Sequence, residues 1–206
     1  MESDAKYRLA GTRQRIIEVA RRLFHARGYA DVGVQDICRR ARVAKGSFYH
    51  FFESKQELLD EVVQRNGLER LDPLAALNRT PYSGRDRLVR HLQSVLDDAH
   101  AQREGDGTVL GCPIGALGSE VALTHPPARQ ATAAWMQRWQ AELRQAIRDG
   151  VGDGSISPTV DPEVTAEALL ALIQGMAVLG RCHDDAGRLQ AIAQLAMKRL
   201  LPARAG

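Results

Sequence analysis

The residues best suited to recognise another molecule lie in one short segment, residues 45–50, with the sequence Lys-Gly-Ser-Phe-Tyr-His. A helix over residues 45–51 would place Lys45, Ser47, Tyr49 and His50 opposite the apolar Phe48. Ammonium, hydroxyl, phenol and imidazole groups bind phosphates and base edges, and aromatic rings contact thymine methyl groups. This combination on one short helix is typical of a helix that enters the DNA major groove.

The neighbouring elements are suited to hold such a helix in place. A preceding short helix is predicted over residues 34–41, and the two would pack through shared apolar residues. These residues are Ile37, Ala41, Val43, Phe48 and Phe52. Lys55, in the first turn of the next helix, would add its charge to the free N–H groups there against a phosphate.

Charge is distributed unevenly along the 206 residues. Residues 1–52 carry 11 basic and 5 acidic side chains, a net charge of +6, whereas the remainder carries −3. A basic segment on a mildly acidic body indicates that a polyanion is held at one end, although solvated arginines alone would give the same count.

The overall composition points to a soluble globular protein. We expect it in the cytoplasm, because its start resembles no signal peptide and no run of about 18 apolar residues is present to cross a membrane. Cys38, Cys112 and Cys182 are odd in number and far apart, which fits neither a disulfide framework nor a metal site. We predict no metal, no cofactor and no catalytic residue.

Helical periodicity recurs and strand signals are almost absent, so we predict an all-α fold. Thr12 would cap a first helix, and Gly28 would end it. Ser54 and Glu57 would form the cap of a fourth helix, and Pro73 would end or bend that helix. Further helices are predicted over residues 85–103, from 113 to before 125, and over 128–148, 162–182 and 185–201.

The last two predicted helices are unusually apolar. Residues 164–179 have hardly any polar face, and a helix of this kind must be covered on most sides. Pairing with a second copy through both helices would cover them, which predicts a homodimer. The alternative is that they form the centre of a monomer.

Residues 13–59 resemble the DNA-binding domain of the TetR family of bacterial transcription regulators. The resemblance lies in Ala20-x-x-Leu23-Phe24, Gly28-Tyr29, Val34-x-Asp36-Ile37, Val43-Ala44-Lys45-Gly46-Ser47-Phe48-Tyr49, Phe52 and Ser54-Lys55-x-x-Leu58. It implies a helix-turn-helix domain at 1–53 and a helical domain for ligand binding and dimerisation at 54–206. It also implies a palindromic operator and a small-molecule effector.

The resemblance, with the helix pattern, predicts one set of DNA contacts. The set is Gln35, Arg42, Ala44, Lys45, Gly46, Ser47, Tyr49, His50 and Lys55. Arg42 departs from the family pattern, because Gly is usual at this turn, where φ is often positive. Val32-Gly33 also departs, because it removes the hydroxyl that usually caps the second helix.

A second distinctive segment runs from Gly111 to Glu120 and contains Cys112-Pro113. If Pro113 is the first helical residue, the helix dipole favours the thiolate of Cys112, which could react with electrophiles or oxidants. The segment resembles a TetR subgroup whose helix begins with Gly-Cys, and some of these members sense electrophiles or unsaturated acids. The alternative is a Cys112 that is a small buried residue.

Four more residues are candidates for the ligand site: His91, Trp135, Trp139 and Gln174. Aromatic residues at this spacing are also common in plain helical cores.

The sequence therefore predicts a ligand-responsive dimeric regulator, a repressor released from DNA by a small effector. The first alternative is a thiol-dependent enzyme that uses Cys112 with His91 or His100 as base. The second is a DNA-compacting or adaptor protein that needs no ligand.

Overall fold

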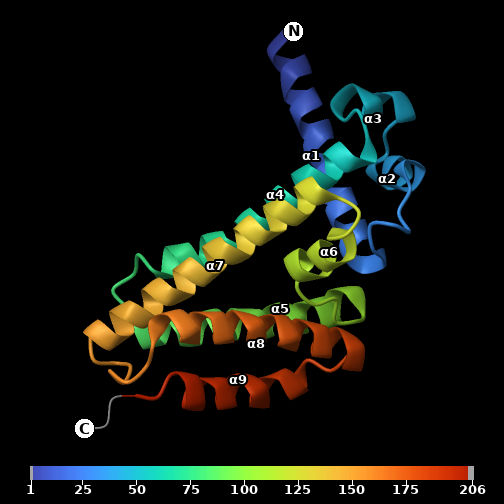
Figure 1. The fold of residues 1–206 in the computed structure, drawn as a ribbon. Coiled ribbons are helices and arrows are strands. Elements are labelled where there is room, and N and C mark those ends of the chain that lie inside the picture. The colour runs from blue at the N-terminus through green and yellow to red at the C-terminus, as the bar shows by residue number, and fades with distance from the viewer. Residues whose placement is uncertain (1, 204–206) are drawn as a thin grey trace. The chain divides into compact units, whose positions relative to one another are not determined.

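A computed structural model describes residues 2–203, with side chains from Gly11 onward, and the all-α prediction is confirmed over this range. The described residues form nine helices (Figure 1). Their bounds are α1 Glu2–Arg27, α2 Val34–Ala41, α3 Lys45–Phe51, α4 Lys55–Leu77, α5 Gly84–Asp106, α6 Pro113–Val121, α7 Pro126–Gly152, α8 Pro162–His183 and α9 Gly187–Leu200.

The chain forms two compact units that are interleaved in sequence. The head unit comprises the chain up to Gly67 together with Pro113–Thr132, and the body unit comprises Leu68–Cys112 and the chain from Ala133 onward. The head unit therefore holds α6 and the first residues of α7 beside α1–α3. The boundary predicted at residue 53 includes none of these later segments, because a sequence boundary cannot join segments that are distant in the chain.

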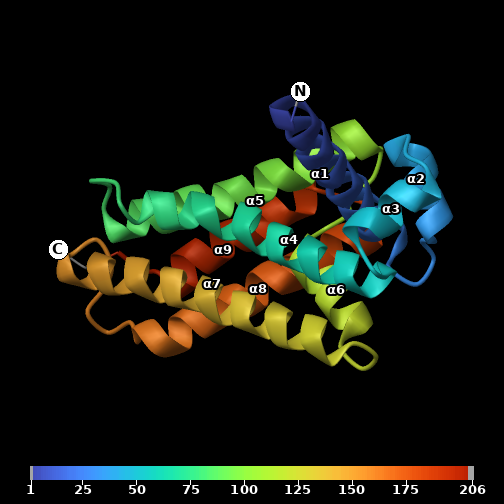
Figure 2. The same ribbon diagram turned by 90° about the horizontal axis from the view of Figure 1, so that it is seen from above.

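The core of the head unit is built on the predicted apolar face of α1. Ile16, Ala20, Leu23 and Phe24 are all buried there. The helices α1, α2 and α3 lie together in both views (Figures 1 and 2), and α6 also packs on α1. Gly28 ends α1 with φ of +86°, a conformation in which a side chain would be strained.

The predicted start of α1 at Thr12 is wrong, because the helix begins at Glu2. Residues 2–10 are mostly good helix formers with no proline, so nothing forces the helix to start at the first available cap. A serine or threonine marks a possible helix start, but it continues a helix when the preceding residues are helical.

The bounds of α2 and α3 are those predicted, and the turn between them explains the unusual Arg42. This residue adopts φ of 54° and ψ of 50°, and its N–H donates to the carbonyls of Arg39 and Cys38. The turn thus keeps its left-handed geometry with an arginine in the position. Gly33 precedes α2 without any side-chain cap, as the sequence indicated.

The helix α4 confirms the predicted cap but not the predicted end. The Ser54 hydroxyl accepts a hydrogen bond from the Glu57 N–H, and the Glu57 carboxylate accepts one from the Glu53 N–H. Pro73 lies inside the helix, which continues to Leu77. A proline removes one backbone hydrogen bond, and the surrounding helix supports the rest.

The body unit contains a core between α5, α8 and α9, which pack against one another. Its buried residues are Leu96, Ala99, Val109, Met176, Ala186, Leu189 and Ala193. Asp161 caps α8 by accepting hydrogen bonds from the N–H groups of Glu163 and Val164, as the Asp-Pro start predicted.

Some apolar side chains of α8 and α9 lie outside this core and are exposed to solvent. Val164 and Val178 are 65% and 61% exposed on α8, and Leu195 is 58% exposed on α9. By length and composition alone α8 could cross a membrane, but a core helix of a protein without a membrane span meets the same criterion. A helix covered by another protein has the same composition.

Candidate DNA-binding surface and sensing site

The helices α2 and α3 separate their apolar and polar residues as predicted. Ile37, Phe48 and Phe52 are at most 1% exposed, and Phe48 packs against Phe52 with 5.7 Å between ring centroids. These buried residues lie on one side of α3. The opposite side faces solvent, and Tyr49 is 49% exposed there.

The predicted DNA contacts form one accessible set in the head unit. Seven of them are exposed: Gln35, Arg42, Ala44, Lys45, Gly46, Tyr49 and His50. Ser47 and Lys55 are partly buried. Lys45 lies near the Tyr49 ring, with 5.9 Å from its Nζ atom to the centroid, so a cation and an aromatic donor lie close together on one surface.

Lys55 has structural contacts in addition to its predicted role. Its Nζ atom donates hydrogen bonds to the carbonyl oxygens of Tyr29 (2.9 Å) and Val32 (3.1 Å). The same atom lies 4.0 Å from the centroid of the Tyr29 ring. Partial burial lowers the pKa of Lys55, against the opposing effect of Glu120. Lys55 therefore holds the loop after α1, and its contact with a phosphate stays a prediction.

The loop at Tyr29 has a second partner, Glu120 at the end of α6. Its carboxylate accepts hydrogen bonds from the N–H groups of Tyr29 (2.9 Å) and Ala30 (2.8 Å). The Tyr29 ring also lies edge-on to His125, with 5.0 Å between centroids. Burial, followed by the charges of Asp60 and Glu120, raises the pKa of Tyr29. No local pattern predicts the role of Glu120, because its partners Tyr29 and Ala30 are 91 and 90 residues away in the chain.

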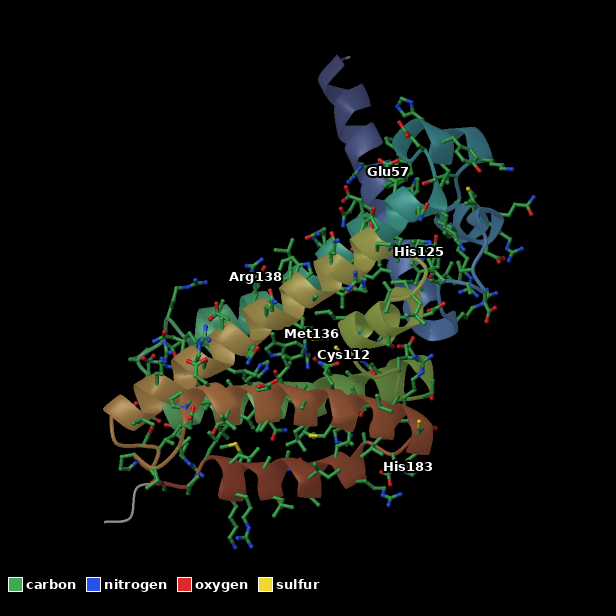
Figure 3. The ribbon with its side chains drawn as sticks, viewed as in Figure 1. Glu57, Cys112, His125, Met136, Arg138 and His183 are labelled. Atoms are coloured by element: carbon green, nitrogen blue, oxygen red, sulfur yellow. The ribbon has the colours of Figure 1, made fainter. Side chains whose placement is uncertain are left out.

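Two of the predicted sensing residues are in contact in the body unit. Cys112 is 6% exposed and directly precedes Pro113, the first residue of α6 (Figure 3). The Gln174 side chain on α8 donates a hydrogen bond to its Sγ atom at 3.7 Å. The thiol therefore lies at the start of α6 with a polar donor directed at it.

A further residue, Gln102, fixes the segment that precedes the thiol. Its carboxamide oxygen accepts hydrogen bonds from the N–H groups of Leu110 and Gly111, and its Nε2 donates to the Gly111 carbonyl. No pattern in the sequence points to Gln102, because a glutamine on a helix surface is usually solvated.

His91 and Trp139 form the second predicted pair in the body unit. The Trp139 Nε1 atom donates a hydrogen bond to His91 Nε2 at 3.0 Å, and both side chains are buried. Burial, followed by the charge of Arg70, lowers the pKa of His91 to about 3, so the ring is neutral. Arg70, which sequence analysis missed, lies over the Trp139 ring with 5.0 Å from Cζ to the centroid.

Trp135 is also buried, and a charged neighbour lies over its ring. The Arg138 guanidinium stacks over its ring with 4.4 Å from Cζ to the centroid (Figure 3 labels Arg138). Among the described residues no group of three or more His, Cys, Asp or Glu side chains could hold a metal ion.

Comparison with known families decides the nature of these surfaces. Residues 16–62 match the bacterial regulatory proteins of the tetR family, and residues 88–196 match the tetracyclin repressor-like C-terminal domain. The chain belongs to the TetR family. The first match contains α2, α3 and all nine predicted DNA contacts, and the second contains His91, Cys112, Trp135, Trp139 and Gln174.

Two similar regulators and one solved structure show how far the likeness extends. YxaF of Bacillus subtilis is 31% identical over 133 residues, which are 63% of this chain. The match covers 66% of YxaF, so this chain spans slightly under two thirds of that relative. The repressor DhaR of Mycobacterium sp. strain GP1 is 28% identical over 92% of each chain. The structure of reduced Escherichia coli NemR has a TM-score of 0.81 at 24% identity and covers 95% of this chain and all of NemR.

The family assignment also answers the alternative of an enzyme. TetR-family proteins are transcription regulators and not enzymes. The thiol-dependent enzyme that we considered from Cys112 is therefore not supported.

Proposed function

We propose that this TetR-family protein is a dimeric transcriptional repressor that binds a palindromic operator and releases it when a small effector binds. The observation that carries the proposal is the exposed polar surface of α2 and α3, backed by the buried Phe48 and Phe52. Repression is supported by the relatives DhaR and NemR, both named repressors. A protein with this role works in the cytoplasm.

The exposed apolar residues of the last two helices support a homodimer through α8 and α9. Val164, Val178 and Leu179 of α8 and Leu195 of α9 are the large apolar side chains concerned, each more than 40% exposed. The helices α8 and α9 pack on each other, so exposed apolar side chains on both support a surface that a second copy covers. Two-fold pairing would also present two α3 helices to the two halves of a palindrome.

Cys112 is the proposed point of response to electrophiles or oxidants. It lies at the start of α6, with the Gln174 amide donating to its sulfur. One similar structure is that of NemR in its reduced form, so the redox state of that relative can change. Covalent modification of a buried thiol adds volume, so the start of α6 would have to move.

The helix α6 is the proposed link from Cys112 to the DNA-binding residues. At its far end, Glu120 binds the N–H groups of Tyr29 and Ala30, and Lys55 binds the carbonyl of Tyr29. A displacement of α6 would strain these contacts, and an effector that binds the displaced arrangement more tightly would shift the population toward it.

The decisive test is fluorescence anisotropy on DNA from upstream of the gene and on scrambled DNA, at two salt concentrations. We expect salt-sensitive binding that prefers the upstream DNA by roughly 10³ or more. Tyr49→Ala should weaken binding while the protein stays folded. Equal affinity for both DNAs would favour a DNA-compacting protein, and no binding at low salt would contradict the proposal.

The thiol is tested separately with Cys112→Ser. The variant should bind operator as the parent does and lose any release caused by an electrophile such as N-ethylmaleimide. Cys182→Ser is the matched control, because Cys182 is exposed near the end of α8. Release that persists in Cys112→Ser but disappears in Cys182→Ser would move the response to Cys182.

A further inference from the structure

The buried imidazole of His91 has one nitrogen engaged and one without a partner. Its Nε2 atom accepts the hydrogen bond from the Trp139 indole at 3.0 Å. Its Nδ1 atom has no hydrogen-bond partner among the described residues, although the side chain is only 2% exposed. Buried polar atoms are rarely left unpaired, so this nitrogen calls for an explanation.

The contact with Trp139 fixes which kind of group is unpaired. An indole N–H can only donate, so His91 Nε2 must accept and carries no proton. The ring is neutral, because burial and the nearby Arg70 disfavour the imidazolium. A neutral imidazole has one proton, which must then lie on Nδ1. The unpaired atom of His91 is therefore a hydrogen-bond donor.

A second unpaired donor lies beside the same tryptophan. The Arg70 guanidinium stacks on the Trp139 ring and binds Asp98 through Nη1, whereas its Nε atom is buried without a partner among the described residues. The positive charge of Arg70 is close enough to His91 to lower its pKa. Two donors and one positive charge thus surround Trp139, and all belong to the body unit.

The neighbouring side chains are apolar. On α5, Leu88 and Val95 lie three and four residues from His91 and share its helix face, and both are buried. On α7, Leu143 lies four residues from Trp139 and is 1% exposed. The two unpaired donors of His91 and Arg70 are therefore surrounded by hydrocarbon.

We propose that His91 and Arg70 form the polar end of the effector site, and that the effector is a small, largely apolar monocarboxylate whose oxygen accepts from His91 Nδ1–H. This inference rests on the proposed ligand-responsive function. The guanidinium favours a carboxylate over a neutral carbonyl, and a hydrogen bond to a charged acceptor is the stronger one. An amine of the same length would meet the two unpaired donors and the like charge of Arg70, whose carboxylate partner Asp98 is bound through Nη1. The Trp139 N–H is a positioning group, because it determines which nitrogen of His91 donates.

Direct binding to the full-length protein tests the site. Calorimetry would use straight-chain carboxylates from propionate to octanoate and n-alkylamines of the same lengths. We expect the preferred carboxylate to bind at least about tenfold more tightly than its matched amine. If no carboxylate in the series binds, or if amines bind equally well, the proposal is overturned.

Two substitutions of His91 separate recognition from packing. His91→Gln retains both an acceptor for Trp139 and an N–H donor, so carboxylate binding should stay within a few-fold of the parent. His91→Phe fills the space without a donor and should weaken binding at least about tenfold. Full affinity in His91→Phe would overturn the proposal, and the carboxylate-amine comparison still decides it if that variant does not fold.

Operator affinity, measured on the same samples, keeps the two proposals apart. Carboxylate binding that weakens operator binding supports both. Carboxylate binding with unchanged operator affinity would support the site and count against the ligand response. Intact operator binding without carboxylate binding would overturn the site alone.

Discussion

The polar residues of α3 and the polar residues around Trp139 are held in opposite ways. Lys45, Tyr49 and His50 are exposed and rest on the buried Phe48, so few of their atoms are committed to the fold. His91 and Trp139 are buried and bind each other. Substitutions of these exposed polar residues of α3 should therefore change recognition without changing stability, whereas substitutions around Trp139 should change both.

The largest contrast is expected between the adjacent residues Phe48 and Tyr49. Phe48→Ala leaves a cavity in the head unit and should lower the free energy of unfolding by about 3–5 kcal/mol. Tyr49→Ala should alter it by less than about 0.5 kcal/mol and still weaken operator binding. Urea unfolding and anisotropy on the two variants measure both quantities, and equal loss of stability would remove the distinction.

The pH dependence of stability should identify His91. Its pKa is about 3 in the folded protein, against 6.5 as the ordinary value, so the unfolded chain takes up the proton first as the pH falls. The free energy of unfolding should therefore decrease from pH 7 downward, by about 2 kcal/mol at pH 5. Urea unfolding at both pH values measures this, and His91→Gln should lack the decrease. If His91→Gln shows the same decrease in the free energy of unfolding, a titratable group other than His91 causes it.

Lys55 and Lys45 provide a smaller contrast within the head unit. Lys55→Ala removes two hydrogen bonds to carbonyls and the contact with the Tyr29 ring, which should cost about 1–2 kcal/mol of stability. Lys45→Ala should leave stability nearly unchanged and reduce the salt dependence of DNA binding by about one ion. Thermal unfolding measures the stability of both variants, and anisotropy at several salt concentrations measures the salt dependence of their DNA binding. Equal losses of stability in the two variants would contradict the proposed difference between Lys55 and Lys45.

The smallest effect is expected at the left-handed Arg42. Arg42→Gly relieves backbone strain but makes the unfolded chain more flexible, so the gain in stability should be below about 1 kcal/mol. Asp184 has a similar φ of 51°, but its carboxylate also accepts hydrogen bonds from Val109 and Thr108. Asp184→Gly should therefore destabilise the protein, and a stabilised variant in a calorimetric scan would contradict this account.

Local patterns were enough to predict the end of α1 at Gly28, the helices α2 and α3, and the cap of α4. Their signals are apolar spacing, a glycine stop and a serine followed by a glutamate three residues later, all of which act within one helical turn. The start of α1 was missed because Thr12 lies within a longer helical segment. The end of α4 was missed because the helix continues past Pro73.

The sequence by itself determined the all-α fold, the DNA-binding helices and which side of α3 faces solvent, because periodicity and capping depend on near neighbours. Only the tertiary structure decided that Glu120 binds the loop at Tyr29, that Gln174 donates to Cys112, and that Arg70 lies over Trp139. These partners are tens of residues apart in the chain. Hydrogen bonds and ring contacts of this kind depend on angstrom-scale packing between helices, which no local pattern specifies.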